Sequence, residues 1–145
     1  MGFTKLITAI IQARMGSTRL PGKVMININQ KPIIQHLYDR LKLSNSIGDI
    51  IVATGSRENN IELVNYLDMQ NIKYFCGSDE DVLNRFYEAS QKNNIKKIVR
   101  ITSDCPFADP KLIDNVVETH IKNNYDYTSN TNPPTFPDGL DIEIF

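Results

Sequence analysis

Short apolar runs alternate with amphipathic stretches along most of the chain, and this alternation constrains the fold more than any other feature. The runs at 6–12, 49–54, 73–76 and 97–101 have the length and composition of strands. The first is apolar at nearly every position, which is typical of a sheet covered by helices on both faces. We therefore predict an α/β fold of three layers, α/β/α, around a mostly parallel sheet.

Between these runs, apolar residues recur at helical spacing and predict four helices. Pro32 suits the first position of one helix, and Asp109 with Pro110 is suited to open the last. Ser78 and Asp81 have the spacing of a capping box ahead of the third. The residues expected to face the core are, helix by helix, Ile33, Ile34, Leu37, Tyr38 and Leu41; Leu63, Val64 and Leu67; Val82, Leu83, Phe86 and Tyr87; and Leu112, Ile113, Val116, Val117 and Ile121.

Two further strands are predicted near the end of the chain, at 125–129 and 140–145. The second alternates polar and apolar residues and has no polar tail after it. The backbone groups of a strand need hydrogen-bonding partners. We therefore expect residues 1–145 to form a single domain that is truncated at its C-terminus, as the N-terminal part of a longer protein, or to be completed by a partner.

Composition excludes several classes of protein. The chain has 145 residues, 41% of them hydrophobic and 23% charged, which suits one globular domain. Its net charge of −1 provides no global basic field, so we expect no nucleic-acid partner. No apolar run approaches the roughly 18 residues of a membrane helix, and the start does not resemble a signal peptide. Cys76 and Cys105 lack metal-type spacing, and we expect a cytoplasmic protein without a membrane partner.

The loop at 13–23 concentrates cations, glycines and hydroxyls. In open α/β sheets, ligands bind beyond the carboxyl ends of the strands. Glycines let backbone N–H groups approach phosphate oxygens, hydroxyls add donors, and arginine grips a phosphate through two parallel bonds. We predict a triphosphate site here, with Arg14 and Lys23 as catalytic residues. The predicted nucleotide-binding residues are Ala13, Arg14, Gly16, Ser17, Thr18, Arg19, Lys23 and, from a later loop, Ser103.

This loop differs from two common phosphate-binding motifs. Five residues separate Gly16 from Gly22, and Val24 stands where an ATPase P-loop has a magnesium-binding Ser or Thr. The dinucleotide fingerprint GxGxxG is absent from the sequence. The alternative interpretation is a basic surface loop between a strand and a helix.

Asp104 follows the strand predicted at 97–101 and should face the same crevice as the cationic loop. Magnesium prefers one or two carboxylates together with phosphate oxygens and water. We therefore predict Asp104 as the metal-binding residue and Mg²⁺ as the cofactor. The alternative is that Asp104 caps a turn ahead of Pro106.

The loop carries a family resemblance. Residues 11–23, IQARMGSTRLPGK, with Lys31-Pro32, resemble the opening of the cytidylyltransferases that activate acidic sugars, such as CMP-KDO synthetase and acylneuraminate cytidylyltransferase. The whole chain is more similar to the family of the spore-coat polysaccharide biosynthesis protein SpsF. The supporting segments are IVAT at 51–54, GSDEDVLNRFY at 77–87, RITSDCP at 100–106 and PDGLDIEIF at 137–145.

The resemblance implies a Rossmann-like nucleotide-diphospho-sugar transferase fold. It also implies the reaction of CTP with a sugar acid to give CMP-sugar and pyrophosphate, for surface or spore-coat polysaccharide, and a homodimer. Asp104 matches the family's metal-binding Asp, and a second metal-binding Asp is expected beyond Phe145. The implied substrate-binding residues are Gly77, Ser78, Arg100, Asp141 and Glu143.

Each of these residues also has an alternative, purely structural interpretation. Arg100 could instead pair at the surface, and Asp141 and Glu143 could form a solvated strand face. His36, His120 and Cys105 are expected to be structural. Asp81 and Arg85, one turn apart, are expected to form a salt bridge on a helix surface.

Three alternative functions stay open. A glycosyltransferase of the related fold usually carries an Asp-x-Asp motif, which this sequence lacks. A nucleotidyltransferase could prefer UTP, GTP or ATP over CTP. A non-catalytic nucleotide-binding domain would need only the cationic loop.

Overall fold

The computed structural model describes residues 7–145, which form a six-stranded sheet of order β5-β4-β1-β6-β8-β7. The strands β1 (Ile7–Gln12), β4 (Ile47–Thr54), β5 (Tyr74–Cys76) and β6 (Ile98–Thr102) run parallel. The predicted mostly parallel sheet is confirmed, with strand ends that differ by one or two residues from those expected. Leu6, which the sequence places in the first strand, lies outside the described residues.

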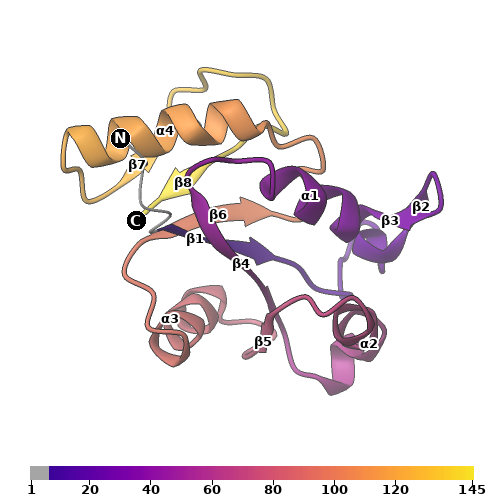
Figure 1. Cartoon of the computed structure of the whole chain (residues 1–145). Coiled ribbons are helices and arrows are strands. Elements are labelled where there is room, and N and C mark those ends of the chain that lie inside the picture. Colours follow the sequence, from indigo (N-terminus) through magenta and orange to yellow (C-terminus); the bar gives the residue numbers. More distant parts are fainter. Residues whose placement is uncertain (1–6) are drawn as a thin grey trace.

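Helices cover both faces of this sheet, as Figure 1 shows. Their bounds are Ile33–Leu41 for α1, Ile61–Met69 for α2, Val82–Lys92 for α3 and Pro110–Lys122 for α4. α1 and α4 lie on one side of the sheet and α3 on the other, so the three layers are confirmed. Between β1 and α1 the chain forms a short 3-10 turn, Lys23–Met25, and a hairpin of β2 (Asn27–Ile28) and β3 (Lys31–Pro32).

The central strand β1 explains why the sequence is apolar there. Ile7, Ala9 and Ile11 pack in the larger core, with residues of α1, α2 and α4. Ile10 points the opposite way and packs in the smaller core under α3. Because successive side chains of a strand alternate between faces, a strand buried on both faces needs apolar residues throughout.

The inner face of α3 differs from the one expected. Leu83 and Tyr87 were predicted to face the core, but they are 78% and 61% exposed. Phe86, as predicted, packs under the sheet together with Ala89, and Arg85 is fully buried beside them. Each residue advances about 100° around a helix, so Leu83 and Tyr87, one position after Val82 and Phe86, turn toward solvent.

In α4, Ile121 was predicted to be inward and is exposed, because His120 takes the last inward position. The His120 ring is fully buried, and its Nδ1 lies 2.9 Å from the Thr128 hydroxyl. Burial lowers the pKa of His120, and the positive charge of Lys97 lowers it further. These contacts agree with the structural role expected for this residue.

The end of the chain forms a strand inside the sheet rather than at its edge. β8 (Glu143–Ile144) pairs antiparallel with β6 on one side and with β7 (Thr128–Ser129) on the other. Phe145 and Ile98 exchange two backbone hydrogen bonds, of 2.7 and 3.1 Å. Both late strands are shorter than predicted. The backbone of β8 thus pairs with a strand on each side within the described residues.

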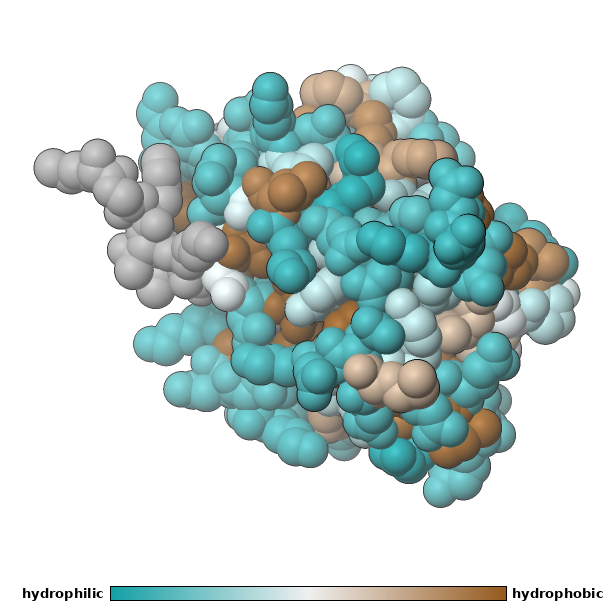
Figure 2. Space-filling model, turned by 45° about the vertical axis from the view of Figure 1, so that its right-hand side comes forward, coloured by the Kyte–Doolittle hydropathy of each residue, from teal (hydrophilic) through white to brown (hydrophobic). Residues whose placement is uncertain are grey.

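The surface is consistent with the mixed composition. On the face drawn in Figure 2, hydrophilic residues predominate and hydrophobic ones form small separate groups. Among residues 7–145, no helix combines the length and the apolar character needed to cross a membrane.

The start of α4 offers a test of local stability. The Asp109 carboxylate accepts a hydrogen bond of 2.9 Å from the backbone N–H of Leu112, as predicted for an N-cap. Asp109→Ala is expected to lower the free energy of unfolding by about 1 kcal/mol, measured by urea denaturation. Asp109→Asn keeps a capping oxygen and should stay close to the wild-type value. Equal stability of all three proteins would refute this role of the cap.

Candidate functional site

A polar cavity of about 260 Å³ lies at the carboxyl ends of β1 and β6. Parallel strands send their carboxyl ends to one edge of the sheet, so the loops that follow them meet there. The structure brings together in this cavity most of the residues predicted for nucleotide and metal. The lining consists of Gln12, Arg14, Ser17, Thr18, Arg19, Lys23, Thr102, Ser103 and Asp104.

The cationic loop folds back on itself around Met15. The carbonyl of Met15 accepts hydrogen bonds from the N–H groups of Ser17, at 3.0 Å, and Gly22, at 2.8 Å. Gly22 has a φ of 69°, a left-handed conformation that favours glycine. This turn closes the loop, so that the side chains of Arg19 and Lys23 reach the same cavity as Arg14.

Two predicted nucleotide-binding residues do not line the cavity. Ala13 is buried, and its N–H donates to the carbonyl of Ala53 at 3.2 Å, which extends the sheet by one residue. At Gly16, an added Cβ would meet no atom within 4 Å, so close packing does not require glycine there. Ala13 therefore anchors the loop rather than contributing its side chain to the cavity.

Lys23 and Asp104 face each other across the cavity, with 3.1 Å between Nζ and Oδ2. Burial alone would raise the pKa of the Asp104 carboxyl, but hydrogen bonds from Thr102 and Lys23 outweigh it and lower the pKa. The carboxylate is therefore charged at neutral pH. The Asp104 side chain is 50% exposed. Such a group can hold a divalent cation next to phosphate oxygens.

Asp104 is the one carboxylate among the residues that line this cavity. Between 7 and 145, no three His, Cys, Asp or Glu side chains converge as a ready metal site. Asp141 lies close enough to Asp104 for the two carboxyl groups to interact electrostatically. Burial raises the pKa of Asp141, and the charges of Asp138, Asp104 and Glu143 raise it further.

A network that the sequence did not reveal holds the first residues of the cationic loop. The Asn60 side chain is buried, and its Oδ1 accepts the N–H of Met15 at 2.8 Å. Its Nδ2 donates to Asp79 Oδ1 at 3.2 Å and to the Ser56 carbonyl at 2.8 Å. Asn60 therefore ties the loop after β1 to the loops after β4 and β5.

Asp79 is the centre of this network. Its carboxylate accepts hydrogen bonds from the N–H and the hydroxyl of Ser56, at 3.1 and 2.6 Å, and from Asn59 at 2.9 Å. These hydrogen bonds, that of the Ser56 hydroxyl above all, lower the pKa of Asp79. The Asp79 backbone carbonyl also accepts a hydrogen bond of 3.2 Å from Arg14 Nη1. A Cβ at position 55 would lie 1.8 Å from Asp79 Oδ1, so the close approach requires Gly55.

Gly77 and Ser78, predicted near the base or the sugar, have structural contacts outside the cavity. The Ser78 hydroxyl accepts the N–H of Asp81 at 3.0 Å, and the Ser78 carbonyl accepts from Arg85 Nη1 at 3.1 Å. An added Cβ at Gly77 would lie 2.9 Å from the Phe75 ring and 3.1 Å from Arg85 Cγ. Their direct contact with a substrate stays a prediction.

The predicted surface salt bridge between Asp81 and Arg85 is wrong. Asp81 is the N-cap of α3, and its carboxylate accepts the N–H of Asn84 at 2.8 Å. Arg85 is fully buried, and its Nε and Nη2 have no hydrogen-bond partner within the described residues. Burial lowers the pKa of Arg85, and the positive charge of Arg14 lowers it further.

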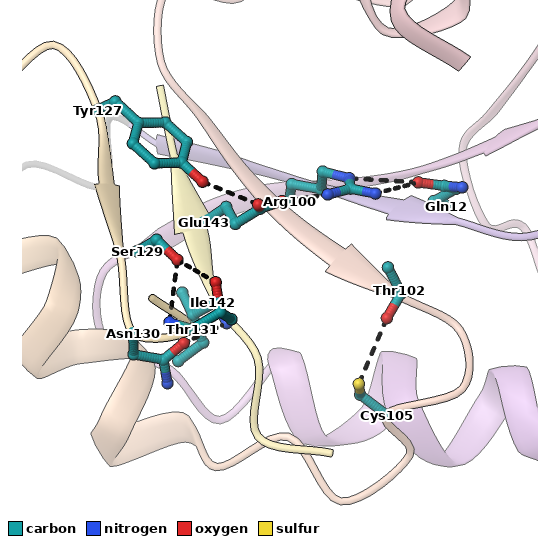
Figure 3. A network of polar contacts seen from close by, with 10 residues as sticks. All are labelled: Gln12, Arg100, Thr102, Cys105, Tyr127, Ser129, Asn130, Thr131, Ile142 and Glu143. Carbon is teal, nitrogen blue, oxygen red and sulfur yellow. Dashed lines mark hydrogen bonds and ion pairs between the residues drawn. The ribbon is translucent and has the colours of Figure 1, made fainter. Parts of the chain in front are cut away.

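Arg100 and Glu143, predicted to bind substrate, form an ion pair between β6 and β8 (Figure 3). Glu143 also accepts a hydrogen bond of 2.8 Å from the Tyr127 hydroxyl, and Arg100 donates to the Gln12 side chain. Neither charged residue lines the cavity, whereas Gln12 does. Arg100 therefore has pairing partners within the sheet, and its direct contact with a substrate stays a prediction.

Cys105 and His36 show no arrangement for catalysis. Cys105 is buried, with its sulfur 3.3 Å from the Thr102 hydroxyl, and burial raises the pKa of its thiol. His36 Nε2 lies 2.7 Å from the carbonyl of Ile28 in the hairpin. These contacts agree with the structural roles expected for both.

Comparison with known proteins gives a consistent result. The profile of the family described as Cytidylyltransferase matches residues 8–138. The chain is 36% identical over 132 residues to the spore coat polysaccharide biosynthesis protein SpsF of Bacillus subtilis, covering 88% of the chain and 55% of SpsF. It is 34% identical over 115 residues to the 3-deoxy-manno-octulosonate cytidylyltransferase of Geobacter metallireducens, covering 77% of the chain and 43% of that enzyme.

A solved structure agrees with these sequence matches. A cytidylyltransferase from Leptospira borgpetersenii superposes with a TM-score of 0.90 at 34% identity, over 97% of this chain and 60% of that one. The chain spans about half the length of the two curated relatives.

The loop network can be tested with two neighbouring asparagines. Asn60→Ala is expected to lower the free energy of unfolding by about 2 kcal/mol, because it leaves the Met15 N–H and the Ser56 carbonyl without their partner and removes one of the donors to Asp79. Asn59→Ala removes one exposed hydrogen bond to Asp79 and should cost about 0.5 kcal/mol or less. Urea denaturation of both variants measures the difference. Equal losses would contradict the special position of Asn60.

Proposed function

Because this chain belongs to the cytidylyltransferase family, we propose that it forms the CTP-binding part of an enzyme that activates a sugar acid. The reaction joins CTP and the sugar to give CMP-sugar and pyrophosphate, for a surface or spore-coat polysaccharide. SpsF and the octulosonate cytidylyltransferase, each similar to this chain, support this choice of pathway and substrate class. An enzyme that consumes CTP would act in the cytoplasm, where CTP is made.

The observation that carries the proposal is the shared cavity of Arg14, Arg19, Lys23 and Asp104. Three cations there can neutralise most of the charge of a triphosphate. The chain as a whole has a net charge of −1, so this positive site is local. A preformed group of charges of this kind lowers the barrier of phosphoryl chemistry because it needs no reorganisation during the reaction.

The residues suggest a division of work in the transfer. A sugar hydroxyl would attack the α-phosphorus in line with the departing pyrophosphate. Arg14 and Lys23 would hold the phosphates and stabilise charge as it moves to the leaving group, and Arg19 would support them. Ser17, Thr18 and Ser103, which line the same cavity, can donate hydrogen bonds to phosphate oxygens.

Asp104 fits the Mg²⁺ that this chemistry uses, because it is a charged, half-exposed carboxylate next to the proposed phosphate position. A bound ion would neutralise negative charge on the phosphates. The Asp104 carboxylate also accepts a hydrogen bond of 3.1 Å from Lys23. The triphosphate would draw the ammonium group of Lys23 to its own oxygens and free the carboxylate for the ion.

The base preference and the reaction are tested together. CTP with Mg²⁺ is expected to raise the melting temperature more than UTP, GTP or ATP does. Incubation with CTP and acidic sugars should then release pyrophosphate. Binding of CTP without pyrophosphate release would favour the alternative of a non-catalytic nucleotide-binding domain. Failure of CTP to bind would refute the proposed function.

Removal of the central cation should weaken nucleotide binding. Lys23→Ala is expected to raise the Kd for CTP at least about tenfold, because it removes a charged hydrogen bond and leaves Asp104 facing the phosphates. Turnover in a complete protein should fall by a similar factor. Lys122→Ala, at the exposed end of α4, removes the same charge away from the cavity and serves as control. An unchanged Kd in Lys23→Ala would refute the role of this lysine.

The role of Asp104 predicts a specific loss of metal dependence. In the wild-type protein, Mg²⁺ is expected to strengthen CTP binding relative to binding in EDTA. Asp104→Asn should lose most of this gain, because the amide is a much weaker ligand for a hard cation. Glu118→Gln, on the exposed surface of α4, is the matched control. Calorimetric titrations with and without Mg²⁺ measure both, and an equal gain in both variants would contradict the assignment.

A further inference from the structure

Gln12 connects the candidate site to the interior of the sheet. It is the last residue of β1, and its side chain lines the cavity with Arg14, Lys23 and Asp104. Its Oε1 accepts two hydrogen bonds from Arg100, of 2.9 Å from Nη2 and 3.2 Å from Nε. One side chain thus contacts both the cavity and the ion pair of the sheet.

The chemistry of arginine fixes which way the Gln12 amide points. A guanidinium group has only donors, so the amide oxygen must face Arg100. The Nε2 group then points away from Arg100, as Figure 3 shows. Within residues 7–145, no protein group accepts a hydrogen bond from Nε2, so its two N–H donors are available to a ligand.

Arg100 is itself held from the other side. It forms the ion pair with Glu143, and Glu143 in turn accepts a hydrogen bond of 2.8 Å from the Tyr127 hydroxyl. Arg100 and Glu143 are direct partners in the register of β6 and β8. The guanidinium carbon also lies 6.0 Å from the centre of the Phe86 ring. These contacts keep Arg100 beside the sheet and out of the cavity.

We infer that Gln12 contacts the nucleotide, with Nε2 donating to a phosphate oxygen, and that Arg100 is a positioning residue that orients the Gln12 amide. This inference rests on the proposed function. The ligand chemistry follows from the cavity, which Gln12 lines together with the cations Arg14, Arg19 and Lys23. An anionic oxygen is the acceptor that suits such a lining, and the hydrogen bond to a charged group is a strong one.

The first experiment measures the Kd for CTP with Mg²⁺ by calorimetry. Gln12→Met keeps the length of the side chain but removes the donor, and it is expected to weaken binding about tenfold. Gln91→Met, at an exposed position of α3, is the matched control and should not change the Kd. An unchanged Kd in Gln12→Met overturns the inference. A raised KM for the sugar with unchanged CTP affinity also overturns it, because the donor would then serve the second substrate.

A double-mutant cycle tests the positioning role. Arg100→Lys keeps the positive charge and the pairing with Glu143 but cannot donate from two nitrogens of a rigid fork. It is expected to weaken CTP binding about threefold in the wild-type background, and not at all in the Gln12→Met background. A merely structural effect of Arg100 would appear equally in both backgrounds and would overturn this role.

The outcome separates this inference from the proposed function. Lys23→Ala serves as the reference in the same titrations. If Lys23→Ala weakens CTP binding and Gln12→Met does not, the inference fails while the proposed function stands. If the wild-type chain does not bind CTP, the proposed function fails and the inference fails with it. A melting temperature of Gln12→Met close to that of the wild type would exclude loss of folding as the cause of weaker binding.

Discussion

The parallel pairing of β1 with β4 and β6 is the constraint on which the rest of the structure depends. It sends the carboxyl ends of these strands to one edge of the sheet, where the cationic loop meets the segment containing Asp104. Residues about eighty positions apart in the sequence thereby come within 3.1 Å of each other. A sheet of other topology would leave Lys23 and Asp104 on separate surfaces, and the charges could not act on one ligand.

The features of this arrangement that depend on the local hydrophobic pattern could be predicted from the sequence. The apolar runs gave the parallel strands, and the cations of the loop and Asp104 were identifiable because each follows such a run. Gln12, Asn60 and Asp79 could not be identified, because their roles come from contacts with residues that are remote in the sequence. The sequence around a polar residue at the end of a strand does not indicate which distant residue will form a hydrogen bond with it.

The same distinction explains the errors. Periodicity placed Leu83 and Tyr87 inward, but it could not say that the smaller core accommodates one row of side chains and a buried guanidinium. Arg100 and Glu143 were predicted to bind substrate from the family resemblance. The structure pairs them with each other and Arg100 with Gln12, while their direct contact with a substrate stays a prediction.

The position of β8 has a consequence for the order in which the protein folds. This strand lies between β6 and β7 and joins residues near 99 to residues near 144, so the pairing closes a long loop. During synthesis, β1, β4 and β6 can assemble while one side of β6 still exposes its backbone donors and acceptors. The Arg100 side chain lacks its acidic partner throughout that interval. The ion pair that holds Arg100 beside Gln12 therefore forms late, when Glu143 and Ile144 pair with β6.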